Sequence, residues 1–154
     1  MRFLLFILGL VCAAAVGCSS TSIPRSTSAP QTVPVPQSPP ASAGSDETLA
    51  RAFEQGTSDI QVEGQGVVQR VLSDDDDGRR HQRFIVALAS GQTLLISHNI
   101  DLAPRVAGLQ EGDAVSFSGE YEWNAKGGVI HWTHRDPSKR HRAGWIKHNG
   151  KIYQ

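Results

Sequence analysis

Between Ile60 and His134, apolar and polar residues alternate with a period of two, in short runs separated by turn residues. Successive side chains of a β-strand point to opposite faces, so each run predicts a strand with one face in a core. The predicted strands are Ile60–Leu72, His81–Leu88, Thr93–His98, Ala114–Trp123 and Val129–His134. This pattern restricts the chain to a mainly β fold.

The connections between these strands indicate how they are arranged. Gly64 and Gly66 allow a bend or bulge in the first strand, and Asn124–Gly128 forms a hairpin turn before the fifth. We expect Asn99–Val106 to form one or two helical turns between the third and fourth strands. Five strands with these connections match the order of an OB-fold barrel, whereas a small sandwich needs more strands. The predicted fold is therefore a five-stranded OB-like barrel.

The fourth strand indicates which side chains face the core. Its large apolar residues share one face: Val115, Phe117, Tyr121 and Trp123. Glu120 and Glu122 alternate with them and are expected on the solvent side.

Two short elements flank the predicted barrel. Ser45 can cap a helix whose first turn carries Asp46 and Glu47, and Gly56 can end it. At the other end, Asn149-Gly150 lies between alternating residues, which is a strong signal for a two-residue hairpin. We therefore expect a short N-terminal helix and a C-terminal hairpin.

The N-terminal segment has the pattern of a secretion signal. Arg2 precedes an apolar run that is too short for a comfortable membrane span, and Ala15-Val16-Gly17-Cys18 resembles the bacterial lipobox. This resemblance implies that residues 1–17 are a signal peptide and that Cys18 carries acyl chains that bind a membrane. Ser19 after the cysteine implies sorting to the outer membrane, with the protein on its inner leaflet facing the periplasm. The alternative is an ordinary secreted protein that loses Cys18 with its signal peptide.

Residues 18–45 are rich in Pro, Ser and Thr and carry little charge or apolar surface. Such a segment cannot repay the entropy lost on folding, so we interpret it as a disordered tether. The remaining residues, 46–154, suffice for one domain with one core. The only other cysteine, Cys12, lies in the signal peptide, so the domain must fold without a disulfide.

Three stretches resemble a known bacterial family: HQRFIVALASGQTLLISHNIDLAPRV, GDAVSFSGEYEWNAKGGVIHWTHRDP and GWIKHNGKIYQ. From about Gly64 to Gln154 the chain is similar to the family called domain of unknown function 3465. No established activity comes with this resemblance, which bears on the domain boundaries only.

The C-terminal part is basic, and aromatic residues lie between its cations. Asp136 is the only acid among the residues from 126 to the end of the sequence, against seven cations: Lys126, Arg135, Lys139, Arg140, Arg142, Lys147 and Lys151. Cations mixed with aromatic rings suit an anionic polymer, either nucleic acid or glycan. The candidate ligand-binding residues are Lys126, Trp132, Arg135, Arg140, Arg142, Trp145 and Lys147. Alternatively, these cations pair with the acids of Asp74–Asp77.

Histidines offer a second kind of chemistry. A turn at Asp136-Pro137 would let His134, Asp136 and His141 bind zinc or another divalent metal. Such an ion could activate water for hydrolysis. Without this site, no cofactor is expected.

Catalytic candidates come from strands that should be neighbours. His81, Arg83 and His98 lie on the second and third strands, and His131-Trp132-Thr133 resembles half of a phosphodiesterase motif. We favour an envelope-anchored binding module over an enzyme. The alternative is a small, metal-assisted hydrolase of phosphodiester-type bonds. No protein partner can be predicted.

Overall fold

The computed structural model describes residues 43–154. One helix, α1 (Ala43–Gln55), precedes seven strands. The strands are β1 (Ile60–Val71), β2 (His81–Ala87), β3 (Thr93–Asn99), β4 (Ala114–Glu122), β5 (Val129–His131), β6 (Trp145–His148) and β7 (Lys151–Tyr153). The predicted signal peptide, Cys18 and nearly all of the predicted tether lie outside the described residues. Within residues 43–154, no helix is long and apolar enough to cross a membrane.

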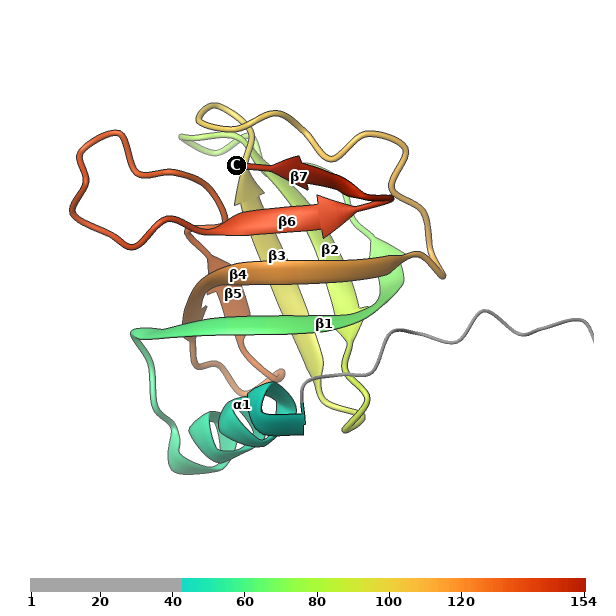
Figure 1. The fold of residues 1–154 in the computed structure, drawn as a ribbon, viewed down its shortest axis with the longest axis vertical. Coiled ribbons are helices and arrows are strands. Elements are labelled where there is room, and N and C mark those ends of the chain that lie inside the picture. Colours follow the sequence, from blue (N-terminus) through green and yellow to red (C-terminus); the bar gives the residue numbers. More distant parts are fainter. Residues whose placement is uncertain (1–42) are drawn as a thin grey trace, which may run out of the picture. The chain divides into compact units, whose positions relative to one another are not determined.

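The first five strands form the predicted closed barrel (Figure 1). Neighbouring strands follow the order β1-β2-β3-β5-β4, and β4 pairs with β1 to close the ring. Only β3 and β5 pair in parallel; the other pairs of the ring are antiparallel. This is the strand order of an OB-like barrel, and the fold prediction is confirmed.

β1 pairs with two neighbouring strands along its length. Ile60–Val67 pairs with β4, and the strand then pairs with β2, with a bulge between Val68 and Arg70. The bulge lies just beyond the predicted Gly64 and Gly66. Gly66 allows β1 to lie close to β2, because a Cβ atom there would lie 2.4 Å from the backbone oxygen of Ala87.

The barrel interior holds the alternating apolar residues of the strands. Phe84, Leu94, Ile96, Phe117, Tyr121 and Ile130 are 0% exposed. They come from four strands, and each of these strands turns one apolar face toward the core. The inward placement of Phe117 is therefore correct.

Helix α1 covers one end of the barrel, below β1 in Figure 1. Leu49 is fully buried in the core, and Asp46 Oδ2 accepts a hydrogen bond from the backbone N–H of Ser90 in the β2–β3 turn. Gly56 has a φ of 65°, a left-handed conformation that ends the helix, as predicted. The helix begins at Ala43, slightly before the predicted cap at Ser45.

The inward placement of Trp123 was wrong. β4 ends at Glu122, so the alternation stops before Trp123, and this side chain is 41% exposed. Its indole Nε1–H donates to the carbonyl of Phe53 at 3.0 Å, and its backbone N–H donates to Ser58 Oγ at 2.9 Å. Trp123 thus joins the barrel to the end of α1.

The expected helical connector between β3 and β4 is a series of turns instead. Pro104 disfavours a helical conformation of the preceding residue, which interrupts any helix over this segment. Its carbonyls also have other partners: His98 Nε2 lies 3.1 Å from Pro104 O, and Gln82 Nε2 donates to Val106 O at 3.2 Å. Buried side chains of the barrel therefore hold the connector in place.

β5 is shorter than predicted, because Trp132 takes a φ of 51° and leaves the strand. β5 pairs with residues 120–122 of β4, and β6 pairs with residues 115–118 along the same edge. β5 and β6 thus behave as two pieces of one strand, with residues 132–144 looped out between them. We call this segment the basic loop. The predicted C-terminal hairpin is confirmed, with positive φ at both Asn149 and Gly150.

Candidate anion-binding surface

The basic loop stands away from the barrel between β5 and β6 (Figure 1). Its ends meet where the N–H of Gly144 donates to the carbonyl of His134 at 3.0 Å. A Cβ atom on Gly144 would lie 2.1 Å from the carbonyl oxygen of Trp132, so only glycine allows this closure. The loop is therefore held at its base by backbone contacts.

Asp136 organises the interior of the basic loop. Its Oδ1 accepts the N–H of Ser138 at 2.8 Å, and its Oδ2 accepts those of Arg140 at 2.7 Å and His141 at 3.0 Å. Desolvation raises the pKa of Asp136, but these three hydrogen bonds and the positive charge of Arg140 together outweigh it, and the pKa lies below its ordinary value. The one carboxylate of the loop is thus committed to backbone groups.

An aromatic stack fixes the loop against β4. The rings of Trp132 and His141 lie 3.8 Å apart and nearly parallel, at 13°. Glu120 lies between two histidines: its Oε1 is 3.5 Å from His131 Nε2 and its Oε2 is 3.5 Å from His141 Nδ1. Burial lowers the pKa of His131, although Glu120 and Glu122 oppose that shift. In this arrangement the His141 ring covers one face of the Trp132 ring.

The cations of this region are exposed, and none of them forms an ion pair with an acidic side chain of the described residues. Four of them lie in the basic loop, and three others lie near it in the sequence: Arg135, Lys139, Arg140, Arg142, Lys126, Lys147 and Lys151. Within residues 43–154, no ion pair engages any of these seven side chains. The loop thus presents positive charge to solvent.

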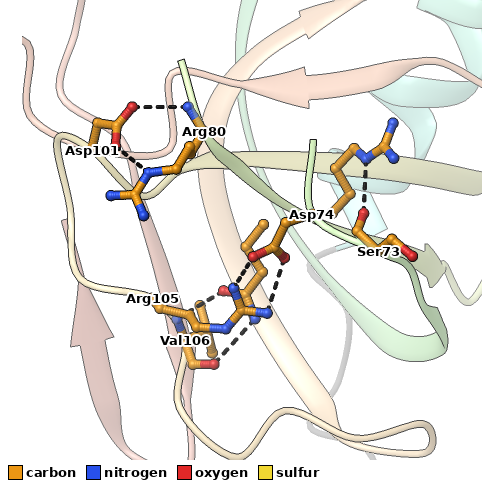
Figure 2. A network of polar contacts seen from close by, with 8 residues as sticks. Ser73, Asp74, Arg80, Asp101, Arg105 and Val106 are labelled. Atoms are coloured by element: carbon orange, nitrogen blue, oxygen red, sulfur yellow. Dashed lines mark hydrogen bonds and ion pairs between the residues drawn. The ribbon is translucent and has the colours of Figure 1, made fainter. Parts of the chain in front are cut away.

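Two acids of the β1–β2 loop pair with cations outside the C-terminal part, and Figure 2 shows one of them, Asp74. Asp74 forms a two-pronged ion pair with Arg105, and Asp75 Oδ2 lies 3.6 Å from Arg83 Nη1. The alternative that Asp74–Asp77 neutralise the C-terminal cations was wrong.

Figure 2 also shows how this loop is joined to the β3–β4 connector. Asp101 accepts hydrogen bonds from both the backbone N–H and the Nε–H of Arg80, each at 2.8 Å. The N–H of Val106 donates to Gln82 Oε1 at 2.9 Å. The network is structural and leaves the cations of the basic loop free.

A hollow of about 140 Å³ lies on the outer face of the barrel, beside the start of the basic loop. Its walls come from β2, β3, β5 and the two adjoining loops: Arg79, His81, Ser97, Asn99, His131, Trp132 and His134. The register explains their proximity, because His81 pairs with Asn99 and the parallel β3–β5 pairing at Ile96 and Ile130 continues toward Ser97 and His131. Sequence reasoning did not find Arg79 or Asn99, because their proximity depends on this register.

The catalytic candidates do not form one group. His81 and His131 line the hollow, whereas His98 points into the core and is 0% exposed. Arg83 is on the outer face but donates its Nε–H to the carbonyl of Ser73 at 3.1 Å. Because Gln82 pairs with His98 and Arg83 with Ser97, His98 lies on the opposite face from Arg83. The expected site of His81, Arg83 and His98 is not assembled.

The predicted metal ligands also do not converge. Asp136 binds backbone N–H groups, His141 stacks on Trp132, and His134 Nδ1 lies 2.8 Å from the carbonyl of Arg135. Across residues 43–154, no three histidine, cysteine or acidic side chains are arranged to hold a metal ion.

The candidate ligand-binding residues divide into two sets. Trp132, Arg135, Arg140 and Arg142 belong to the basic loop, and Trp145 and Lys147 follow on one face of β6. Lys126 lies apart, in the turn before β5, where it lines a groove beside α1 together with Phe53 and Gln92. The structure therefore brings most of the predicted ligand-binding residues into one region and excludes Lys126.

These features define an OB-like barrel with a basic loop inserted in the edge formed by β5 and β6. The chain belongs to the family described as "Protein of unknown function (DUF3465)", whose model matches residues 34–154. The comparison with curated proteins finds none that matches the chain.

Proposed function

We propose that this domain is a binding module for an anionic glycan and that the basic loop is its main contact surface. The observation that carries this proposal is the exposed, unpaired state of Arg135, Lys139, Arg140 and Arg142 on a loop whose only carboxylate is bound to backbone. Exposed cations that form no ion pair attract a polyanion at long range and form charge-assisted hydrogen bonds with it at short range.

The internal contacts of the loop favour binding. The Asp136 hydrogen bonds, the closure at Gly144 and the Trp132–His141 stack limit the conformations that the loop can adopt. A preorganised surface loses less conformational entropy when a ligand binds, so more of the contact energy contributes to affinity.

Two features favour a glycan over single-stranded nucleic acid. OB barrels bind both kinds of polymer on the face of their second and third strands. Binding of single strands without sequence preference relies on aromatic rings on which bases stack, and the strands β2 and β3 present no Phe, Tyr or Trp on their outer face. Trp132 is close to this face, but His141 covers one side of its ring.

The signal-like N-terminus supports a site of action at the cell envelope. Under this proposal, acyl chains on Cys18 hold the domain at a membrane of the cell envelope, where anionic glycans are candidate ligands. Cys18→Ser should then release the protein from the membrane fraction. Normal processing of this variant together with unchanged sedimentation with membranes would contradict the anchoring.

A binding competition tests the proposed ligand class. The purified protein is titrated with a fluorescent sulfated polysaccharide, and unlabelled single-stranded DNA and a neutral polysaccharide of equal length serve as competitors. The sulfated polymer should bind and the neutral one should not compete. Arg140→Gln with Arg142→Gln should weaken binding, whereas Arg51→Gln with Arg70→Gln, which removes two exposed cations elsewhere, should not. Tighter binding of DNA than of the sulfated polymer would overturn the glycan proposal.

A further inference from the structure

The hollow beside the basic loop has a wall made only of groups that can donate hydrogen bonds. Each of its seven side chains carries an N–H or O–H, and none is acidic: Arg79, His81, Ser97, Asn99, His131, Trp132 and His134. Glu120 and Glu122 approach His131 Nε2 at 3.5 and 3.7 Å, but neither carboxylate lines the hollow. The wall therefore suits a ligand that accepts hydrogen bonds.

Several of these donors have no partner within the described part of the chain. The side chains of Arg79, His81 and Ser97 make no hydrogen bond there. His131 Nε2 also makes no hydrogen bond, but the carboxylates of Glu120 and Glu122 lie within ion-pair distance of it. Asn99 and His134, by contrast, already have backbone partners through Oδ1 and Nδ1. The donors of Arg79, His81 and Ser97 are therefore available to a ligand that accepts hydrogen bonds.

The charge and the size of the hollow restrict the class of ligand further. Arg79 carries a fixed positive charge, and guanidinium groups bind oxyanions through two parallel hydrogen bonds. A volume of about 140 Å³ accommodates one small group rather than a run of polymer. We propose that the hollow binds a single oxyanion, a sulfate, phosphate or carboxylate, carried by one sugar unit.

This subsite rests on the proposed glycan-binding function and extends it. Trp132 and His134 belong both to the hollow and to the basic loop. A glycan that crosses the loop would thus reach the hollow with one charged substituent. The loop would supply nonspecific attraction, and the hollow would select the substituent and its position on the sugar.

The experiment uses NMR chemical shifts of the isotope-labelled full chain. The ligands are a sulfated disaccharide, inorganic phosphate, glucuronate and, as a neutral reference, glucose. We expect the oxyanions to shift the amide and side-chain signals of Arg79, His81 and Ser97, and glucose to leave them unchanged. The oxyanion that binds most tightly identifies the substituent.

Substitutions then locate the binding. Arg79→Gln with His81→Gln should weaken binding of the best small oxyanion at least about tenfold, because a charge-assisted hydrogen bond is lost. Arg70→Gln, an exposed arginine outside the hollow, should have no effect. Retained affinity in the double variant, or shifts confined to the basic loop, would overturn the subsite.

The two proposals fail in different ways. If a long sulfated polymer binds but no small oxyanion perturbs the hollow, the subsite is wrong and the polymer-binding function stands. If small oxyanions bind in the hollow but the polymer does not bind, the subsite stands and the polymer-binding function is wrong.

Discussion

Burial keeps the His98 side chain neutral in the folded protein, and this predicts how the free energy of unfolding changes with pH. Its ring is 0% exposed, with Nε2 3.1 Å from the carbonyl of Pro104 and Nδ1 2.8 Å from Thr133 Oγ1. A carbonyl only accepts, so Nε2 carries the proton and Nδ1 accepts the hydrogen bond from the Thr133 hydroxyl. Desolvation is the main reason why the pKa of His98 falls to about 4.

The direction of this pH effect follows from the protonation of His98 in the folded and in the unfolded chain. Above pH 6.5 the ring is neutral in the folded and the unfolded chain, so its contribution to the free energy of unfolding is constant. Between pH 6.5 and about 4 the unfolded chain binds a proton that the folded chain does not, so stability falls as the pH falls. The lowered pKa corresponds to about 3 kcal/mol over this window, at roughly 1.4 kcal/mol per pKa unit. This is a large share of the roughly 5–15 kcal/mol that stabilises a small domain.

Urea unfolding of the protein and of His98→Gln between pH 7.5 and 4.5 measures this contribution. The variant should be less stable at neutral pH, and the difference should shrink or reverse toward pH 4.5 because glutamine does not titrate. Thr133→Val is the matched control: it removes the hydroxyl but leaves the histidine, so the fall with pH should persist. A stability difference between the protein and His98→Gln that stays constant across this range would refute the account of a buried, neutral His98.

Four other substitutions test the fold and the basic loop. Phe117→Ala should lower the free energy of unfolding by about 3–5 kcal/mol and Trp123→Ala by distinctly less, since Phe117 is 0% and Trp123 41% exposed. Equal losses in urea unfolding would argue against this register of β4. Gly128→Ala should lower the melting temperature strongly, because φ is 108° and the added carbon would lie 2.1 Å from the Tyr121 ring; an unchanged temperature would contradict this packing. Asp136→Ala should speed tryptic cleavage of the basic loop while the melting temperature changes little, and unchanged cleavage would show that its hydrogen bonds do not hold the loop.

Most of the strands could be predicted because each has one buried face. The period of two in β2, β3 and β4 reflects burial of alternate residues in one core, and Asn149-Gly150 specifies a hairpin through its own backbone preferences. The prediction failed where a strand ends, because the pattern alone does not reveal the end. Trp123 continues the alternation in sequence but lies beyond β4, and Trp132 leaves β5 through a left-handed conformation that is rare for its residue type.

The sites depended on contacts that the sequence does not encode locally. The cations of the basic loop were found by composition, since all of them lie close together in the sequence. The hollow was missed because Arg79, Ser97 and His131 come from separate segments and meet only through the register of three strands. His98 was grouped with His81 and Arg83 because their strands were expected to be neighbours, but neighbouring strands do not by themselves place side chains on the same face.

The most direct test of glycan binding by the basic loop is the dependence of affinity on salt. Affinity for a sulfated polysaccharide is measured at a series of salt concentrations, for the protein and for the variant Arg140→Gln, Arg142→Gln, Lys147→Gln. Each contact with a polyanion releases counterions, so the loss of three contacts should flatten the slope of log affinity against log salt by about 2–3. A variant that binds as tightly and with the same slope as the unmodified protein would contradict the proposed role of the basic loop.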